Sequence, residues 1–166
     1  MERPRETRRV SDATFVLEAN GAYEGLPFAA VRQFLVDRGA RRVTTIVHPL
    51  TPEAPSEHVV ERWDRAVGAA RRRRVTLPSR PPWTYPLDLI VPPLPPPADV
   101  YVGFNNLACS RGIAARTVGR VQRVAYWAVD FVPDRFGARR PLTVAYDTLD
   151  SWVCRRADVR FEVSAA

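Results

Sequence analysis

The chain has 166 residues, of which 46% are hydrophobic, and this length suits one domain with one hydrophobic core rather than two full-sized domains. Its formal net charge is +7, but all 25 basic residues are arginine, as in proteins from G+C-rich bacterial genes, so the charge alone is weak support for a nucleic-acid partner. Two cysteines are too few for a disulfide framework, and no apolar segment predicts a membrane span or a secretory signal. We therefore expect a soluble cytoplasmic protein, with the inner face of the membrane as an additional contact.

Residues 1–11 are polar, basic and without a periodic pattern, which predicts a mobile arm. The apolar, β-rich run at 14–17 predicts a buried strand that enters a turn at 18–21. Apolar residues at helical spacing then predict a helix from about 26 to 38, which Gly39 would end.

A second buried strand is predicted at 43–47. The segment 56–70 fits either a helix or a hairpin that turns near Gly68, and we favour the hairpin, at about 57–76. The proline-rich segment 78–97 predicts an extended surface connection.

The pattern resumes with a strand at 99–104, a helix that Asn105 or Asn106 caps and that runs to about 118, and a strand at 123–129. A helix beginning at Pro141 then presents an apolar stripe that we expect to face the sheet. The stripe consists of Leu142, Ala145, Leu149, Trp152 and Val153. Alternating polar and apolar residues at 159–163 predict a half-exposed edge strand.

Strands that alternate with helices are typical of a parallel sheet with helices on both faces. The sequence therefore predicts a single Rossmann-like α/β domain at residues 12–166, with an inserted hairpin. In such a domain the loops that follow the strands meet at the carboxyl edge of the sheet, where these folds bind their ligands.

Polar and flexible residues follow the predicted strands at 14–17, 99–104 and 123–129. The substrate-binding candidates are Asn20, Gly21, Tyr23, Gly25, Asn105, Asn106 and Arg135. The first loop offers backbone N–H groups to a phosphate, but it lacks the glycine spacing of a dinucleotide site, and its glycines fit an ordinary turn equally well. The two asparagines are helix caps in the simpler interpretation, and Arg135 is then a partner in a surface ion pair.

Two residues are candidates for acid–base catalysis. Asp130 follows an apolar run, where a carboxylate can accept a proton from a sugar hydroxyl, and His48 ends a strand, where it can transfer a proton near neutral pH. Each also has a structural interpretation, a loop hydrogen bond for Asp130 and a bond to a backbone carbonyl for His48. No zinc spacing or Walker loop is present, so we expect neither a metal nor a cofactor.

Several motifs together resemble a known family. They are His48-Pro49-Leu50, the segment Asp99-Val100-Tyr101-Val102-Gly103-Phe104-Asn105, Gly119-Arg120-Val121, and the run from Tyr126 to Phe136. With Tyr146-Asp147-Thr148-Leu149-Asp150, Ala157-Asp158 and Val163-Ser164, the chain resembles the amino-terminal half of bacterial glycosyltransferases with twin Rossmann domains, similar to family 4 retaining enzymes.

This resemblance implies an acceptor-binding domain whose nucleotide-sugar donor is bound mainly by a second domain or a partner chain. It implies that Asp130, His48 and the 18–25 loop line the substrate cleft. We therefore expect transfer of a sugar to a glycan or small-molecule acceptor, with this chain inactive on its own. The alternatives are a noncatalytic domain that binds a sugar, a nucleotide or a protein and, less favoured, a basic nucleic-acid-binding protein.

Overall fold

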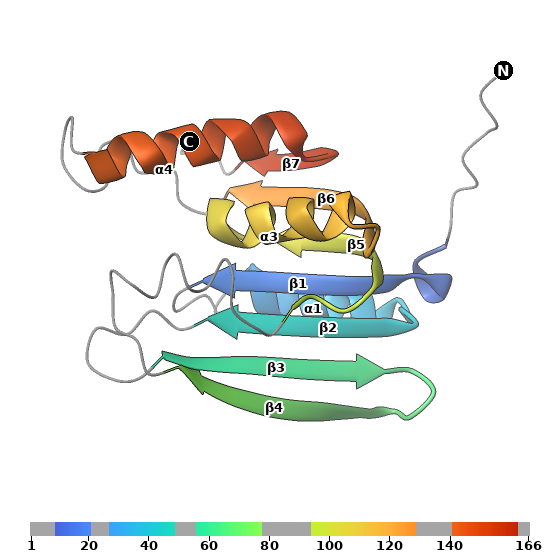
Figure 1. The fold of residues 1–166 in the computed structure, drawn as a ribbon. Helices are drawn as coiled ribbons and strands as arrows, with labels where there is room; N and C mark the ends of the chain where they lie inside the picture. Colours follow the sequence, from blue (N-terminus) through green and yellow to red (C-terminus); the bar gives the residue numbers. More distant parts are fainter. Residues whose placement is uncertain (1–8, 21–26, 49–55, 78–93, 129–140, 163–166) are drawn as a thin grey trace, which may run out of the picture.

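The computed structural model describes residues 9–20, 27–48, 56–77, 94–128 and 141–162, which form one seven-stranded sheet with helices on both faces (Figure 1). The strands lie in the order β4-β3-β2-β1-β5-β6-β7. Their bounds are β1 Thr14–Asn20, β2 Arg42–His48, β3 Ser56–Asp64, β4 Ala69–Leu77, β5 Ala98–Gly103, β6 Val121–Ala128 and β7 Val159–Glu162.

The central strand, β1, pairs in parallel with β2 on one side and with β5 on the other. Strands β6 and β7 continue the parallel set beyond β5, and β7 is an edge strand, as predicted. Strands β3 and β4 run antiparallel and form a hairpin beside β2. The α/β class, the Rossmann-like sheet and the inserted hairpin are therefore confirmed.

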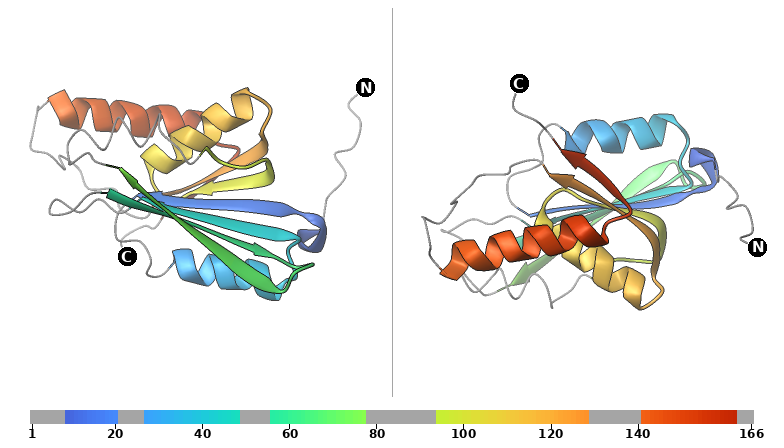
Figure 2. Two further views of the ribbon diagram at one scale, coloured as in Figure 1. Left: turned by 60° about the horizontal axis from the view of Figure 1, so that its bottom comes forward. Right: turned by 90° about the horizontal axis from the view of Figure 1, so that it is seen from above.

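In the described part of the chain, three α-helices connect parallel strands. Helix α1 (Phe28–Asp37) covers one face of the sheet, whereas α3 (Asn106–Thr117) and α4 (Pro141–Arg156) cover the other (Figure 2). Helices α1 and α3 are followed by Gly39 and Gly119, whose φ angles of 71° and 74° lie in the left-handed region that glycine favours.

The two faces of the sheet bury separate apolar clusters. On the α3 and α4 side the cluster includes Val16, Ile46, Tyr101, Ile113, Val124 and Val153. On the α1 side it includes Leu17, Phe28, Leu35, Val43, Val102 and Phe104. Because successive residues of a strand point to opposite faces, the neighbours Val16 and Leu17 contribute to different clusters, and both are fully buried.

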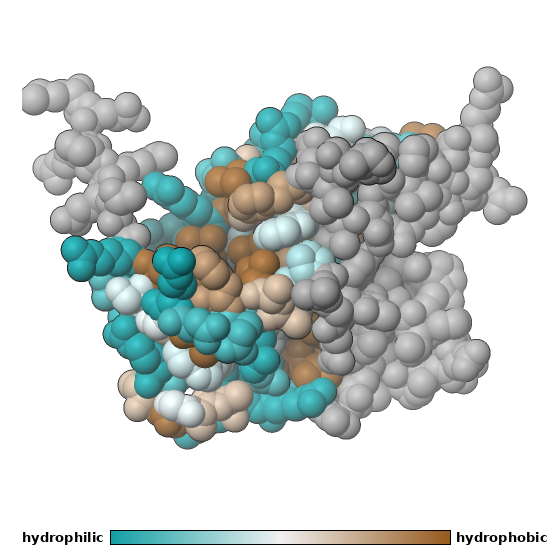
Figure 3. Space-filling view, turned by 180° about the vertical axis from the view of Figure 1, so that it is seen from behind, coloured by the Kyte–Doolittle hydropathy of each residue, from teal (hydrophilic) through white to brown (hydrophobic). Residues whose placement is uncertain are grey.

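A row of aromatic rings crosses the α1 side of the sheet. The ring centroids of Phe28 and Phe104 are 5.0 Å apart, those of Phe104 and Trp127 are 5.6 Å apart, and those of Trp127 and Phe161 are 4.8 Å apart. Phe161, on the edge strand β7, remains 44% exposed. From this side, apolar residues lie near the middle of the described surface and hydrophilic residues surround them (Figure 3).

The hairpin prediction for the middle of the chain is correct. Its turn ends at Gly68, whose φ of 63° is again left-handed. Val60 packs on the α3 side and Trp63 on the α1 side, so these two residues alternate between faces as strand residues do. The alternative helix would have placed both on one side.

The last residues of the predicted mobile arm at 1–11 are part of the fold. Residues 1–8 lie outside the described residues, but Val10–Asp12 form a short 3-10 helix that leads into β1. Val10 packs against the apolar cluster on the α1 side. This contact holds the end of the segment against the sheet, and the polar sequence around Val10 did not predict it.

The predicted apolar stripe of α4 is wrong in its first half. Leu142 and Ala145 are exposed, and the buried residues of the helix are Thr143 and Val153. The buried side carries a polar contact as well, because the Tyr126 hydroxyl donates a hydrogen bond to Asp150. Two polar side chains that hydrogen-bond to each other can take the place of apolar residues at a helix–sheet contact. The spacing of apolar residues in the sequence does not predict such a pair.

Candidate functional site

Sheet topology marks one place where a ligand site is expected. From β1 the chain passes through α1 to β2 on one side, whereas β5, on the other side of β1, leads through α3 to β6. The two helices leave on opposite faces of the sheet (Figure 2). Ligands of open α/β sheets bind beyond the carboxyl ends of the strands at such a switch point. We call the ends of β1, β2 and β5, with the first turn of α3, the carboxyl edge.

The structure brings four of the predicted site residues to this edge. Asn20 and His48 are the last residues of β1 and β2 and are paired in register. Asn105 and Asn106 begin α3 directly after β5, and the Phe104 N–H donates a 2.9 Å hydrogen bond to the Glu18 carbonyl of β1. The other five candidates lie outside the described residues. They are Gly21, Tyr23, Gly25, Asp130 and Arg135.

Below the carboxyl edge lies a buried polar cluster that the sequence analysis did not predict as a unit. It consists of Glu18, His48, Tyr101 and Arg111, and we call it the Glu18 cluster. His48 Nε2 is 2.7 Å from Glu18 Oε1, and the Tyr101 hydroxyl is 2.5 Å from Glu18 Oε2. Arg111 Nε lies 2.6 Å from Glu18 Oε1, as an ion pair rather than a well-aligned hydrogen bond. At most 5% of any of these four residues is exposed.

The cluster ties four elements together. Glu18 belongs to β1, His48 to β2, Tyr101 to β5 and Arg111 to α3. The Tyr101 hydroxyl also lies 2.8 Å from the carbonyl oxygen of Ala108 on α3, so its single proton has two acceptors within reach. Burial, and then the Glu18 carboxylate, raise the pKa of Tyr101 well above its ordinary value. Tyr101 therefore stays a neutral donor that supports the negative charge of Glu18.

His48 is held rather than free at the edge. Its side chain is completely buried, and its Nε2 atom lies within hydrogen-bond distance of Glu18 Oε1. Such a carboxylate contact fixes the tautomer and the orientation of an imidazole, as in the positioning half of a catalytic triad. Complete burial is equally typical of a histidine with a purely structural role, so a catalytic role for His48 stays a prediction.

The end of β1 was placed too early in the sequence analysis. Glu18 was expected in a turn, but the strand continues to Asn20 and Glu18 is buried within it. A carboxylate can occupy a central strand only if the fold supplies compensating donors, and Arg111 and Tyr101 supply them here. Arg111 was missed because it is one of 25 arginines and lies 93 positions from Glu18 in the sequence.

The first turn of α3 presents two asparagines with different roles. Asn105 is the N-cap, as predicted, and its Oδ1 accepts a 2.8 Å hydrogen bond from the Ala108 N–H. Asn106 is fully buried, yet neither its Oδ1 nor its Nδ2 has a hydrogen-bond partner among the described residues. Because helical side chains tilt toward the amino terminus, this amide lies toward the end of α3 that meets the carboxyl edge. An unpartnered buried amide requires an explanation, such as a bound ligand or water.

The two cysteines are free, and both lie in helices as predicted. Cys109 is buried, and this burial raises the pKa of its thiol strongly, which keeps it protonated and unreactive. Cys154 is only half-buried. Within the described ranges no three or more histidine, cysteine or acidic side chains gather as a metal site would require.

Comparisons with known proteins found no matching protein-family model, curated protein or solved structure, so the fold is assigned from the sheet topology. None of the helices in the described part of the chain combines the length and the apolar character needed to cross a membrane.

Proposed function

We propose that this chain is the acceptor-binding half of a glycosyltransferase that uses a nucleotide-sugar donor held mainly by a second domain or a partner chain. The observation that carries the proposal is the switch point between β1 and β5, where polar residues of three elements meet. A Rossmann-like sheet with helices on both faces is the architecture that the sequence resemblance implies. We place this activity in the cytoplasm, with the inner membrane face as an additional contact.

The chemistry of the carboxyl edge suits a neutral, hydroxylated ligand. Side-chain amides can donate to and accept from sugar hydroxyls at the same time, and Asn106 has both an unpaired donor and an unpaired acceptor. A helix terminus adds backbone N–H groups next to this amide. A partner domain over the edge would exclude water and hold donor and acceptor in reacting geometry, which is the larger part of the rate gain in a bimolecular transfer.

In this proposal Asp130 is the base that accepts the proton of the attacking hydroxyl, and it follows β6 two residues after Ala128. Its role rests on this position in the sequence. His48 acts as a second polar group at the end of β2, oriented by Glu18. Asn20, Gly21, Tyr23, Gly25 and Arg135 complete the proposed acceptor site.

The first test is acceptor binding by the Asn106→Leu variant. Since the Asn106 amide makes no hydrogen bond to the described residues, we expect leucine, which has the same branched arrangement of side-chain heavy atoms, to leave the free energy of unfolding within about 1 kcal/mol of the original value. We expect sugar binding to fall about tenfold or more, because a bound hydroxyl loses its amide partner. Ligand-observed saturation-transfer NMR with a panel of mono- and disaccharides measures this change.

Two outcomes would count against the binding site. One is the absence of a saturation-transfer signal from any sugar at millimolar concentration, and the other is a sugar signal that Asn106→Leu leaves unchanged. Thr117→Ser is the matched control, because it lies at the opposite end of α3 and serine retains the hydrogen bond from the Thr117 hydroxyl to the Ile113 carbonyl. This variant should keep both stability and sugar binding.

The second test is transfer itself. The chain alone should transfer no sugar from nucleotide-sugar donors. It should transfer sugar when a separately produced donor-binding domain encoded beside it is added. Product formation from a labelled donor, followed by mass spectrometry, measures transfer. Sugar binding without transfer in every reconstituted mixture would instead support the noncatalytic alternative.

A further inference from the structure

A second surface lies away from the carboxyl edge, on the hairpin. Strand β4 pairs with β3 through all nine of its residues, and its other side forms an edge of the sheet (Figure 1). The described residues provide no strand next to that side. Nine residues exceed the usual strand length of about 5–6, and a long open edge is a template for another chain.

Arginines project from β4 on both faces of the sheet. Arg71 and Arg73 are opposite Arg62 and Val60 of β3, and Val60 packs on the α3 side. Arg72 is opposite Glu61, which pairs with Arg32 of α1 on the other face. Since successive strand residues alternate, the basic run places positive charge above and below the plane of the sheet. Arg71, Arg72 and Arg73 are all exposed.

The nearby carboxylates already have other partners. Asp64 contacts Arg42 at 3.3 Å and Arg62 at 3.6 Å. Its pKa is lowered, first by the Ala66 N–H and further by Arg42. Among the described acidic residues none pairs with Arg71, Arg72 or Arg73, so the hairpin carries uncompensated positive charge.

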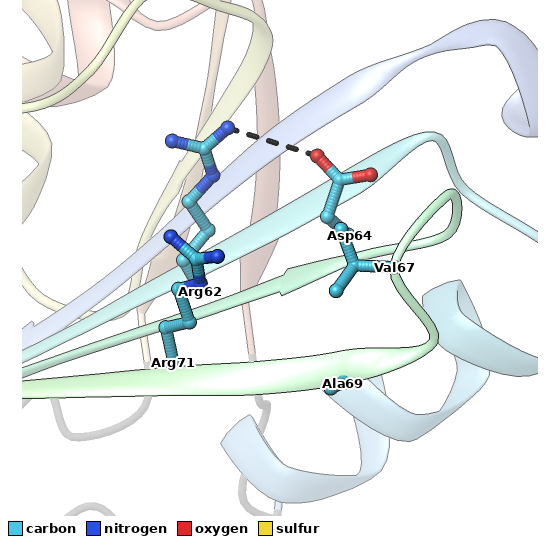
Figure 4. Close-up of a pocket in the computed structure, with 5 residues that line it drawn as sticks. All are labelled: Arg62, Asp64, Val67, Ala69 and Arg71. Atoms are coloured by element: carbon cyan, nitrogen blue, oxygen red, sulfur yellow. Dashed lines mark ion pairs between the residues drawn. The ribbon is translucent and has the colours of Figure 1, made fainter.

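A pocket on the α3 side of the hairpin contains two neighbouring arginines. Arg62, Asp64, Val67, Ala69 and Arg71 line it. The side chains of Arg62 and Arg71 rise next to each other from neighbouring strands, and only Arg62 is paired with Asp64 (Figure 4). Like charges directly opposite each other on a sheet destabilise it, so an added negative charge at this position is favourable.

We propose that β4 binds an extended, acidic segment of another protein as an additional strand of the sheet. An added strand lies in the plane of the sheet, where its backbone pairs with the open edge and its side chains reach the arginines on both faces. A flat membrane would meet one face only. Sheets that bind single-stranded nucleic acid use aromatic side chains for stacking, and the Arg62 face of the hairpin presents none among its described residues.

A second copy of this chain is a poor partner for the edge, because it would bring the same arginines into contact with each other. The charge of β4 thus opposes edge-to-edge self-association and selects a partner of opposite charge. This inference does not depend on the proposed sugar transfer, since β4 is not part of the carboxyl edge.

The test uses the whole chain and a synthetic ten-residue peptide in which pairs of glutamates alternate with pairs of threonines, so that both faces of the added strand carry glutamate, with a fluorescent label. We expect binding that weakens with salt and that protects amides of β4 from hydrogen exchange. The double variant Arg71→Ser/Arg73→Ser should bind the peptide about five- to tenfold more weakly, as the loss of two exposed ion pairs predicts. The matched control Arg155→Ser, at an exposed position of α4, should bind normally.

A peptide of the same sequence with alternate backbone amides methylated separates strand addition from simple charge attraction. Strand addition requires that this peptide bind at least about tenfold more weakly. Equal binding of the methylated peptide, or no binding of either peptide, would overturn the proposal. So would tighter binding of phosphatidylglycerol vesicles or of a single-stranded oligonucleotide than of the peptide, since either would identify a different class of partner.

Discussion

Replacement of Glu18 by alanine is expected to lower the free energy of unfolding by about 3–5 kcal/mol, the range measured when one partner of a buried ion pair is removed. The variant leaves the Arg111 guanidinium buried without its carboxylate, and His48 Nε2 and the Tyr101 hydroxyl lose the same acceptor. Because these residues belong to three strands and α3, the loss should affect the whole sheet. Urea unfolding followed by circular dichroism measures the change.

The matched control for this variant is Glu61→Ala. Glu61 also pairs with an arginine, Arg32, but both side chains are partly exposed, and such pairs contribute about 1 kcal/mol or less. An unfolding free energy for Glu18→Ala that differs from that of Glu61→Ala by less than about 1 kcal/mol would show that the cluster does not hold the edge together.

Gly103→Ala is expected to destabilise the fold by about 3 kcal/mol, at the upper end of the usual cost of overpacking. A Cβ atom at this position would lie 2.4 Å from the backbone nitrogen of Cys109 and 2.5 Å from its Cα atom. These are backbone atoms of α3, so the helix itself must move away from β5. Displacement of α3 would also separate Arg111 from Glu18. Thermal unfolding and the NMR shifts of α3 amides measure both effects.

Gly68→Ala separates this steric effect from the general cost of replacing glycine. Gly68 has a φ of 63°, but an added Cβ atom would meet nothing within 4 Å, so only the left-handed backbone penalty of about 1 kcal/mol remains. At Gly103, whose φ is not positive, the cost is steric alone. A smaller loss for Gly103→Ala than for Gly68→Ala would contradict the close contact of α3 with β5.

The sequence predicted most of the fold, because local patterns determine where strands and helices form. Alternation and apolar runs located the five parallel strands of the described residues, and the favoured hairpin with a turn near Gly68 is correct. The errors occur where a distant residue changes what the local pattern means. Glu18 ended a strand in the prediction but lies inside β1, and the first half of α4 buries Thr143 instead of the predicted Leu142 and Ala145.

The candidate site was predicted only in part for the same reason. Topology and residue type were enough to gather Asn20, His48, Asn105 and Asn106 at one edge. Nothing in the sequence separates Arg111 from the other arginines, and its importance follows from the single carboxylate that it reaches in the folded chain. A buried ion pair between distant positions becomes visible only when the topology places its two elements side by side.

The central position of β1 has a consequence for how the molecule is built. This strand is synthesised before one of its two neighbours, β5, which is bonded to it across 85 positions, from Thr14 to Asp99. During synthesis one side of β1 can therefore pair with β2 while its other side has no partner until β5 has left the ribosome. Contacts of such sequence separation slow folding, so we infer that completion of the sheet is a late, cooperative event and that the nascent chain is prone to aggregation before it.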